Sequence, residues 1–227
     1  MATETSGATA PDVAGLAIGV LGGTGDQGRG LARRLSMAGH RVIIGSRKAE
    51  RAAAAAADLG DGLLAGAENR DAAAAADVII AAMPWEGHRD LLLSLAEQLA
   101  GKVVIDCVNP IGFDSHGAYA LPVPEGSAAE QAAAVLPDST VVGAFHHVPA
   151  GLLLDPAVAA VDMDVLVLGD SRPATDLVIA LASEIPGMRG IYGGRLRNCG
   201  QVEALTANLV SINRRYHAHA GIRITDV

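Results

Sequence analysis

The chain has 227 residues, half of them hydrophobic, and a formal net charge of −8. This acidic balance argues against nucleic acid or an anionic membrane as the main partner. Two cysteines are too few for a disulfide framework, and no apolar run is long enough to cross a bilayer. Residues 1–15 are small and polar, which is typical of a disordered leader and not of a signal peptide. We therefore expect a soluble protein of the cytoplasm that folds around a sizeable core.

The first expected element is a buried strand over residues 16–21, an apolar run rich in strand-forming residues. Gly23, Gly25 and Gly28 then make a Gly-x-Gly-x-x-Gly turn, and residues 27–38 continue with helical spacing. In order, these glycines would allow a tight turn, let a pyrophosphate approach the backbone, and let the helix pack on the strand. Free amides at the helix start would bind the phosphates. The order of strand, glycine turn and helix predicts a dinucleotide site.

The second expected strand, residues 41–45, ends where enzymes that use NAD place an acidic residue against the ribose 2′-hydroxyl. This chain has Ser46 and Arg47 there, with Arg51 one helical turn further on. A hydroxyl and a guanidinium are suited to donating hydrogen bonds to a 2′-phosphate. Basic side chains at a helix start also oppose the helix dipole unless an anion binds there. The pattern favours NADP over NAD, and a solvated helix turn is the alternative interpretation.

Strands and helices continue to alternate along the chain. We expect strands over residues 63–65, 77–82, 102–106, 140–144, 165–168 and 189–192, with a short edge strand at 222–225, and helices over 47–59, 69–76, 91–99, 127–135, 174–184 and 198–217. Residues 107–126 are expected to form a long loop. The alternation predicts an α/β fold, a doubly wound Rossmann-type and mostly parallel sheet with a small C-terminal α/β extension. Residues 16–150 would form the NADP-binding domain, and residues 151–227 would pack on it.

Three of these strands end in segments that would meet at one edge of the sheet, namely residues 83–86, 108–110 and 145–150. Met83 and Trp85 would wall a nicotinamide site, although Trp85 capping the core is an equal alternative. His146 and His147 are candidates for moving a proton because histidine titrates near neutrality. Adjacent histidines rarely share a metal, and the sequence has no Gly-x-Ser-x-Gly motif, so we expect neither a metal site nor a hydrolase.

The combination of these segments resembles the NADPH-dependent reductases of the deazaflavin coenzyme F420. The resemblance rests on the glycine turn, on Gly45-Ser46-Arg47, and on residues 83–86, 144–150 and 208–224, and it covers the chain from residue 16 onward. It implies an oxidoreductase that moves a hydride reversibly between nicotinamide C4 of NADP(H) and C5 of coenzyme F420. It also implies a homodimer, to which residues 151–227 contribute, with these two small-molecule redox coenzymes as its partners.

The resemblance assigns roles to individual residues. The pyrophosphate would be lined by Thr24, Gly25, Asp26 and Gln27 between Gly23 and Gly28, the 2′-phosphate by Ser46, Arg47 and Arg51, and the nicotinamide half by Met83, Trp85 and Val148, with Ala220 closing over it. Asn109, Pro110, His146 and Pro149 would face the deazaflavin, and His146 is the expected catalytic residue, stabilising the region that takes up a proton. The anionic tail would lie on basic surface, with Arg195, Arg197, Arg214 and Arg215 as candidates. His147 stands where the family pattern has a smaller polar residue.

Two other functions stay open on the sequence. One is an NADP-dependent reductase of a small imine or keto substrate. Such an enzyme would usually carry a long helical second domain, and the roughly 75 residues after Ala150 are too few to build one. The other is a non-catalytic NADP sensor, which would keep the glycine turn and Arg47 but would have no use for a second ring pocket.

Overall fold

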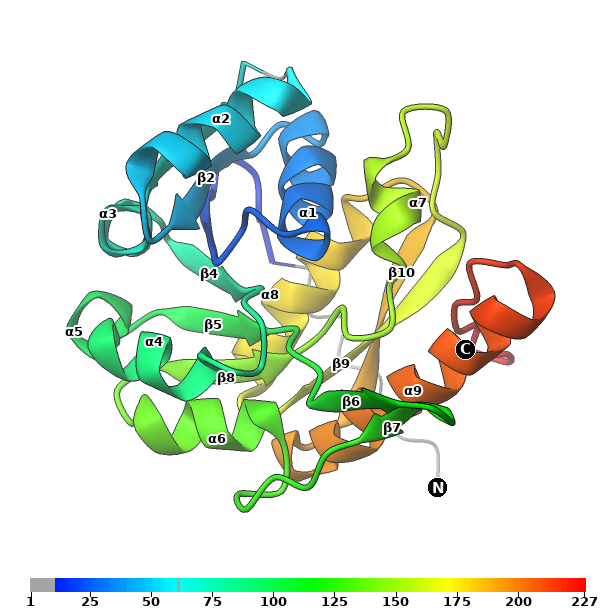
Figure 1. The fold of residues 1–227 in the computed structure, drawn as a ribbon. Coiled ribbons are helices and arrows are strands. Elements are labelled where there is room, and N and C mark those ends of the chain that lie inside the picture. The colour runs from blue at the N-terminus through cyan, green and yellow to red at the C-terminus, as the bar shows by residue number, and fades with distance from the viewer. Residues whose placement is uncertain (1–10, 61) are drawn as a thin grey trace, which may run out of the picture.

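The computed structural model describes residues 11–60 and 62–227, and one eight-stranded sheet forms its centre (Figure 1). The strands lie in the order β10-β9-β8-β5-β4-β1-β2-β3, and neighbours are parallel except β8 and β9. They are β1 (Ala17–Leu21), β2 (Arg41–Ser46), β3 (Leu64–Glu68), β4 (Val78–Ala81), β5 (Val103–Asp106), β8 (Thr140–Gly143), β9 (Met163–Gly169) and β10 (Met188–Gly194). A separate antiparallel hairpin pairs β6 (Ile111–Asp114) with β7 (Gly117–Ala120).

Helices cover both faces of the sheet because successive strand residues point to opposite sides. Ile18 and Val20 of β1 belong to a core with α1 (Asp26–Met37), α2 (Ala49–Leu59), α7 (Ala150–Leu154) and α8 (Arg172–Ser183). Leu21 of β1 belongs to a second core with α3 (Asn69–Ala75), α4 (His88–Ser94), α5 (Ala96–Leu99), α6 (Ala128–Val135) and α9 (Cys199–Tyr216), which follows a 3-10 turn (Leu196–Asn198). In the described part of the chain, no helix combines the length and the apolar character that a membrane span requires.

The doubly wound, mostly parallel sheet confirms the fold class expected from the sequence. Residues 151–227 extend the same sheet through β9 and β10. Of the leader expected over residues 1–15, residues 1–10 lie outside the described part, and Val13 is buried just before β1. The helix expected over residues 91–99 begins earlier, at His88, and is interrupted at Leu95.

The expected long loop at residues 107–126 was wrong, because the β6–β7 hairpin forms within it and lies beside α9 (Figure 1). The hairpin turn depends on Gly117, whose φ of 122° is accessible mainly to glycine, and on Asp114, whose carboxylate accepts from the amides of His116 and Gly117. The sequence reasoning also missed the short helix α7, since five residues are too few to show a helical period.

The edge strand expected at residues 222–225 is absent from the described structure. This segment is held instead by Asp164, a fully buried carboxylate of β9. The amide of Ile224 donates to Asp164 Oδ2 at 2.6 Å, and the guanidinium of Arg189 donates to both carboxylate oxygens at 2.7 and 2.8 Å. The Arg189 hydrogen bonds lower the pKa of Asp164 despite its burial. The Asp164 carboxylate and Arg189, with one main-chain bond from the Asp164 amide to the carbonyl of Ile222, therefore hold the C-terminal segment in place of a strand ladder.

Small residues set the spacing between α2 and the sheet. Helix α2 contains a run of six alanines, and a Cβ added to Gly66 of β3 would overlap the backbone of Ala52 and Ala53. The helix backbone therefore lies directly on β3, at a distance that only glycine allows.

We predict that Gly66→Ala lowers the free energy of unfolding by roughly 1–3 kcal/mol, because α2 must move away from β3. Gly62→Ala is the matched control, since a Cβ at Gly62 would contact nothing within 4 Å. Urea unfolding of both variants checks the prediction, and equal midpoints would contradict it.

Candidate active site

The glycine turn lies between β1 and α1, at the sheet edge where the carboxyl ends of β1, β4 and β5 meet. A Cβ on Gly28 would lie 2.6 Å from Cα of Gly23, so the helix start approaches the turn as closely as the sequence pattern requires. No side chain of the described residues caps α1 at Gly25, which leaves the amides of its first turn free for an anion. The turn is fixed from the start of α3, where Asn69 Oδ1 accepts from the amide of Gly22 at 3.1 Å.

A wide cavity of about 530 Å³ opens at this turn. It is lined by Gly22, Thr24, Gly25, Asp26, Gln27, Ser46, Arg47, Arg51, Asn69, Ala82, Met83, Pro84, Glu86, Gly87 and Leu91. Ser46 is buried at the end of β2, whereas Arg47 and Arg51 are exposed. No side chain caps α2 at Lys48 among the described residues, so the first turn of α2 also presents free amides. The predicted phosphate-binding residues therefore line one cavity with two helix N-termini.

A narrow cavity of about 260 Å³ adjoins the wide one. Both are lined by Gln27, Ala82, Met83 and Pro84, and the narrow one adds Trp85, Cys107, Val108, Asn109, His146, Val148 and Thr206. The three strand-end segments expected to converge thus meet here, after β4, β5 and β8. Burial raises the pKa of the Cys107 thiol, which donates to the carbonyl of Ala81, so this thiol stays protonated. Met83, Trp85 and Val148 give the narrow cavity apolar surface suited to contact a flat ring, and Asn109, His146 and Thr206 add polar groups.

Hydrogen bonds to main-chain carbonyls hold the segment after β8 in place. Asn109 Nδ2 donates to the carbonyl of His146 at 2.8 Å, and Thr206 of α9 donates to the same oxygen at 3.3 Å. Gln27 Nε2 donates to the carbonyl of Phe145 at 3.2 Å. Phe145 has a φ of 63°, a conformation that costs free energy for a bulky residue and persists only where its surroundings impose it. The bent segment turns these two carbonyls toward elements that line the site.

The two adjacent histidines have different surroundings. His146 lines the narrow cavity, and both of its ring nitrogens are buried without a hydrogen-bond partner among the described residues. His147 lies outside the cavity lining, and its Nε2 accepts from the amide of Leu166 at 3.3 Å, which ties it to β9. Burial lowers the pKa of each to about 4, so both rings are neutral at pH 7. The larger residue at position 147 therefore packs inside the fold, away from the cavity.

Five expected site residues do not line either cavity, and two of them, Gly23 and Gly28, lie within the glycine turn itself. Pro110 starts the hairpin, where its carbonyl accepts from Leu121, and Pro149 is the N-cap of α7. The amide of Ala220 donates to Asn213 Oδ1 at 2.6 Å at the C-terminal end of α9. Conversely, the sequence reasoning missed Asn69 and Thr206. Asn69 directly follows β3, and this position at a strand end could have marked it as a site residue. Thr206 lies within α9, where nothing in the sequence pattern marks it.

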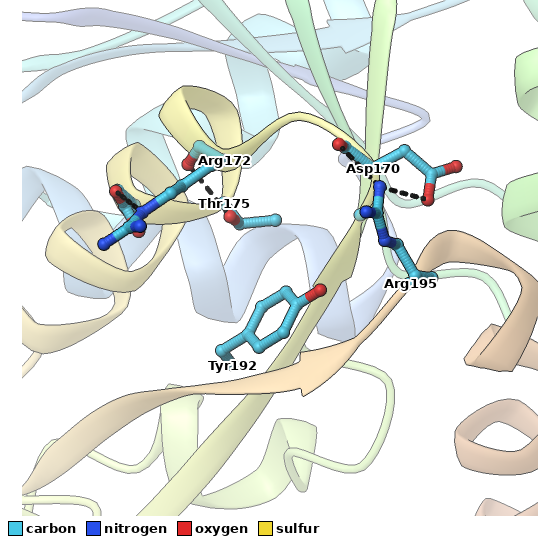
Figure 2. A pocket seen from close by; sticks show the side chains of 7 residues that line it. Asp170, Arg172, Thr175, Tyr192 and Arg195 are labelled. Atoms are coloured by element: carbon cyan, nitrogen blue, oxygen red, sulfur yellow. Dashed lines mark hydrogen bonds and ion pairs between the residues drawn. The ribbon is translucent and has the colours of Figure 1, made fainter. Parts of the chain in front are cut away.

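The four arginines expected to hold an anionic tail do not form one surface. Arg195 lines a separate cavity of about 400 Å³ with Tyr192 and Thr175, beside the carboxyl end of β9 (Figure 2). Figure 2 shows Arg195 turned toward Asp170, to which it donates, while Arg172 is directed away to pair with Asp176. Arg214 and Arg215 line a groove beside the β6–β7 hairpin. Across residues 11–60 and 62–227, no cluster of three or more His, Cys, Asp or Glu could hold a metal ion.

The sheet, the glycine turn and the cavity at its carboxyl edge that Arg47 and Arg51 line define a dinucleotide-binding protein of the Rossmann class. A family model described as "NADP oxidoreductase coenzyme F420-dependent" matches residues 17–110. The F420-dependent NADP reductase of Methanothermobacter marburgensis is 42% identical over 221 residues, covering 92% of this chain and 98% of that protein. The chain therefore belongs to the family of F420-dependent NADP reductases.

Solved structures agree with this membership. A protein of Arthrobacter sp. FB24 assigned as an F420-dependent NADP reductase aligns with a TM-score of 0.80 and 29% identity, covering 93% of this chain and all of that one. An imine reductase of Streptomyces aurantiacus aligns with a TM-score of 0.61 and 23% identity, covering 88% of this chain but only 62% of the enzyme. The second likeness concerns the fold alone.

We predict that Gly25→Ala and Gly28→Ala separate binding from folding. A Cβ at Gly25 contacts nothing in the protein but enters the wide cavity, so dinucleotide affinity should fall about tenfold or more with little change in stability. Gly28→Ala should lower stability as well, because α1 must move away from Gly23. Calorimetric titration and thermal unfolding check both. Unchanged affinity of Gly25→Ala would place the dinucleotide elsewhere.

Proposed function

We propose that this protein transfers a hydride reversibly between NADP(H) and coenzyme F420. The observation that carries the proposal is the pair of joined cavities at one sheet edge, the wide one suited to phosphates and the narrow one to a flat ring. When both coenzymes are bound, the chemistry comes from their rings, between nicotinamide C4 and deazaflavin C5. The protein has to hold two rings in contact and keep water out, and it needs no nucleophile for this.

The wide cavity would bind the phosphates of NADP(H). The first turn of α1, after Gly25, would hold the pyrophosphate through main-chain amides, with Thr24, Asp26 and Gln27 around it. Ser46 and the exposed guanidinium groups of Arg47 and Arg51 would bind the 2′-phosphate at the start of α2. These arginines lie on the same cavity wall as Ser46, which supports a preference for NADP over NAD.

The test is to mix the purified protein with oxidised F420 and either NADPH or NADH and to follow the deazaflavin absorbance. We expect rapid bleaching with NADPH and slow bleaching with NADH. Tight NADPH binding without bleaching would contradict the proposed acceptor and direct attention to imine and keto substrates, or to a sensor without catalysis.

We predict that Arg47→Ala raises the KM for NADPH roughly tenfold to a hundredfold while kcat stays within about twofold, because a charge-assisted contact to the 2′-phosphate is lost before and during reaction alike. The KM for NADH, which lacks this phosphate, should not change. Equal losses with both coenzymes would refute the assignment of the 2′-phosphate to this wall. Arg41→Ala, at the far end of β2, is the matched control.

The narrow cavity would hold the two rings between the segments after β4, β5 and β8, with Met83, Trp85 and Val148 around the nicotinamide and Asn109 near the deazaflavin. His146 would contribute a hydrogen bond there, since its buried ring nitrogens have no partner among the described residues. Its pKa of about 4 means that a neutral imidazole makes this bond. Solvent would then supply the proton that accompanies the hydride.

We predict that His146→Phe lowers kcat with F420 roughly threefold to tenfold, the loss of about one hydrogen bond, while NADPH affinity is retained. Because burial lowers the pKa of His146 to about 4, the ring carries no charge above about pH 5, and between pH 6 and 9 the ratio of wild-type to variant kcat should be constant. Steady-state kinetics across this range check both points. An inflection near neutrality that disappears in the variant would show instead that His146 moves a proton.

We further infer a homodimer in which residues 151–227 supply the contact. Exposed apolar side chains gather on α9 and on the neighbouring hairpin, among them Ile212, Tyr216, Phe113 and Tyr119. Their burial against a second copy would remove apolar surface from water, and light scattering would report twice the chain mass of 23.0 kDa.

We also infer a cytoplasmic location, which the two free, buried cysteines support.

A further inference from the structure

His88 lies directly behind the wall of the narrow cavity and takes no part in the site described above. It is the first residue of α4 and is fully buried. Its ring contacts that of Trp85, with centroids 5.6 Å apart and planes inclined by 31°. Trp85 lines the narrow cavity and His88 does not, so His88 contacts the space proposed for the rings only through the indole.

The hydrogen bonds of His88 determine its charge. Nε2 lies 2.6 Å from Oδ2 of Asp106, and a carboxylate only accepts. Nδ1 lies 3.1 Å from Oε1 of Gln131, whose orientation is fixed because Gln131 Nε2 donates to the carboxylate of Glu125 at 3.2 Å. Both ring nitrogens therefore face acceptors, and both must carry a hydrogen. A histidine that donates from both nitrogens is an imidazolium.

The surrounding charges agree with this reading. Burial acts to lower the pKa of His88, but the Asp106 carboxylate and the two hydrogen bonds outweigh it, and the pKa is raised. The charge of Glu203, a residue of α9, also acts to raise the pKa of His88. The carboxylate of Glu203 accepts from the amides of Ala128 and Ala129, and its own burial raises its pKa to about 7. The charged groups that face His88 are thus Asp106 from β5, Glu203 from α9 and, through Gln131, Glu125.

The same pair also reaches the second wall of the narrow cavity. Asp106 is the last residue of β5, and its Oδ1 accepts from the amide of Val108 at 3.0 Å. Val108 and Asn109 line the narrow cavity together with Trp85. His88 and Asp106 therefore connect the segment after β4 with the segment after β5. An imidazolium within 6 Å of an indole also attracts its electron-rich face.

We propose that His88 is a charged positioning residue, whose imidazolium, fixed by Asp106 and Gln131, holds the Trp85 ring in place as a wall of the narrow cavity. Its effect on hydride transfer rests on the function proposed above. In the neutral form one of the two hydrogen bonds is lost, the attraction to the indole disappears, and the Trp85 ring gains freedom to move. Alignment of the rings, and with it kcat, then depends on the protonation of a residue that touches neither coenzyme.

Trp85 is the single tryptophan of the chain, so its fluorescence reports on His88 directly. A protonated imidazole in contact with an indole quenches its emission more than a neutral one. In the protein without coenzymes we expect the emission to rise as the pH increases through a midpoint above 6.5, the ordinary histidine value. His88→Gln should be brighter and flat over the same range. His116→Gln is the matched control, since His116 also lies beside an aspartate, Asp114, but at the surface. A wild-type emission without this midpoint, or one that His88→Gln leaves in place, overturns the proposal.

Kinetics then separate positioning from a structural role. For His88→Gln we expect kcat with F420 to fall about tenfold while the dissociation constant of NADPH changes less than about threefold, because the phosphates bind in the wide cavity. The wild-type kcat should fall toward the variant value as the pH passes the fluorescence midpoint. Lower thermal stability with an unchanged kcat would overturn the proposal. A wild-type protein that does not reduce F420 would overturn the proposed function instead, and the coenzyme-free fluorescence would still decide the charge of His88.

A second variant keeps the test decisive if His88→Gln does not fold. Gln131→Met removes the acceptor of Nδ1 and leaves the Asp106 pair intact. The imidazolium then loses one stabilising contact, so the midpoint of the Trp85 emission should move to lower pH by about half a unit or more. A midpoint that does not move overturns the proposed hydrogen-bond scheme.

Discussion

The hydrogen bond from the Asn109 side chain to the carbonyl of His146 joins two strand ends that are 37 residues apart in the chain. Parallel strands cannot be linked by a short turn, so their carboxyl ends are brought together only by the sheet and by contacts of this kind. The narrow cavity lies where these ends converge. Thr206 donates to the same carbonyl, and α9 is thereby attached to the site. This carbonyl directly follows Phe145, whose positive φ bends the chain at the end of β8, so two elements that line the cavity are tied to one bend.

Small side chains determine how closely the helices approach this sheet. With only 3% aromatic residues, the core is filled mainly by aliphatic side chains, and alanines and glycines let the backbones approach closely at several places. Gly28 against Gly23 and Gly66 against α2 are the closest examples considered above. Close packing leaves few large side chains to line a pocket, and Trp85 is the exception in the narrow cavity. The shape of the narrow cavity therefore depends strongly on the orientation of the Trp85 ring.

The sequence predicted those features that arise from short-range patterns. The glycine turn, Ser46 and Arg47, and the strand ends at Trp85, Asn109 and His146 lie where alternating strands and helices require, and the structure brings them to one edge. The β6–β7 hairpin escaped because its exposed Phe113 and Tyr119 do not alternate with polar residues as a half-buried strand would. Asn69 contacts Gly22, which lies 47 positions earlier in the chain, and Thr206 contacts His146, which lies 60 positions earlier. No local sequence pattern reveals contacts over such separations.

Four buried histidines show why residue type alone could not identify the group that titrates. His146 has no partner for either nitrogen among the described residues, His147 has a single main-chain donor, and burial keeps both neutral at pH 7. His40 is likewise buried without partners in that part of the chain. Only His88, of these four, faces two acceptors, one of them a carboxylate at 2.6 Å. Burial opposes charge in His88, His146 and His147, so the outcome depends on whether acceptors compensate the lost solvation. A histidine singled out by sequence as the proton carrier is thus held neutral, whereas an unremarked one at the start of α4 carries the charge beside the cavity.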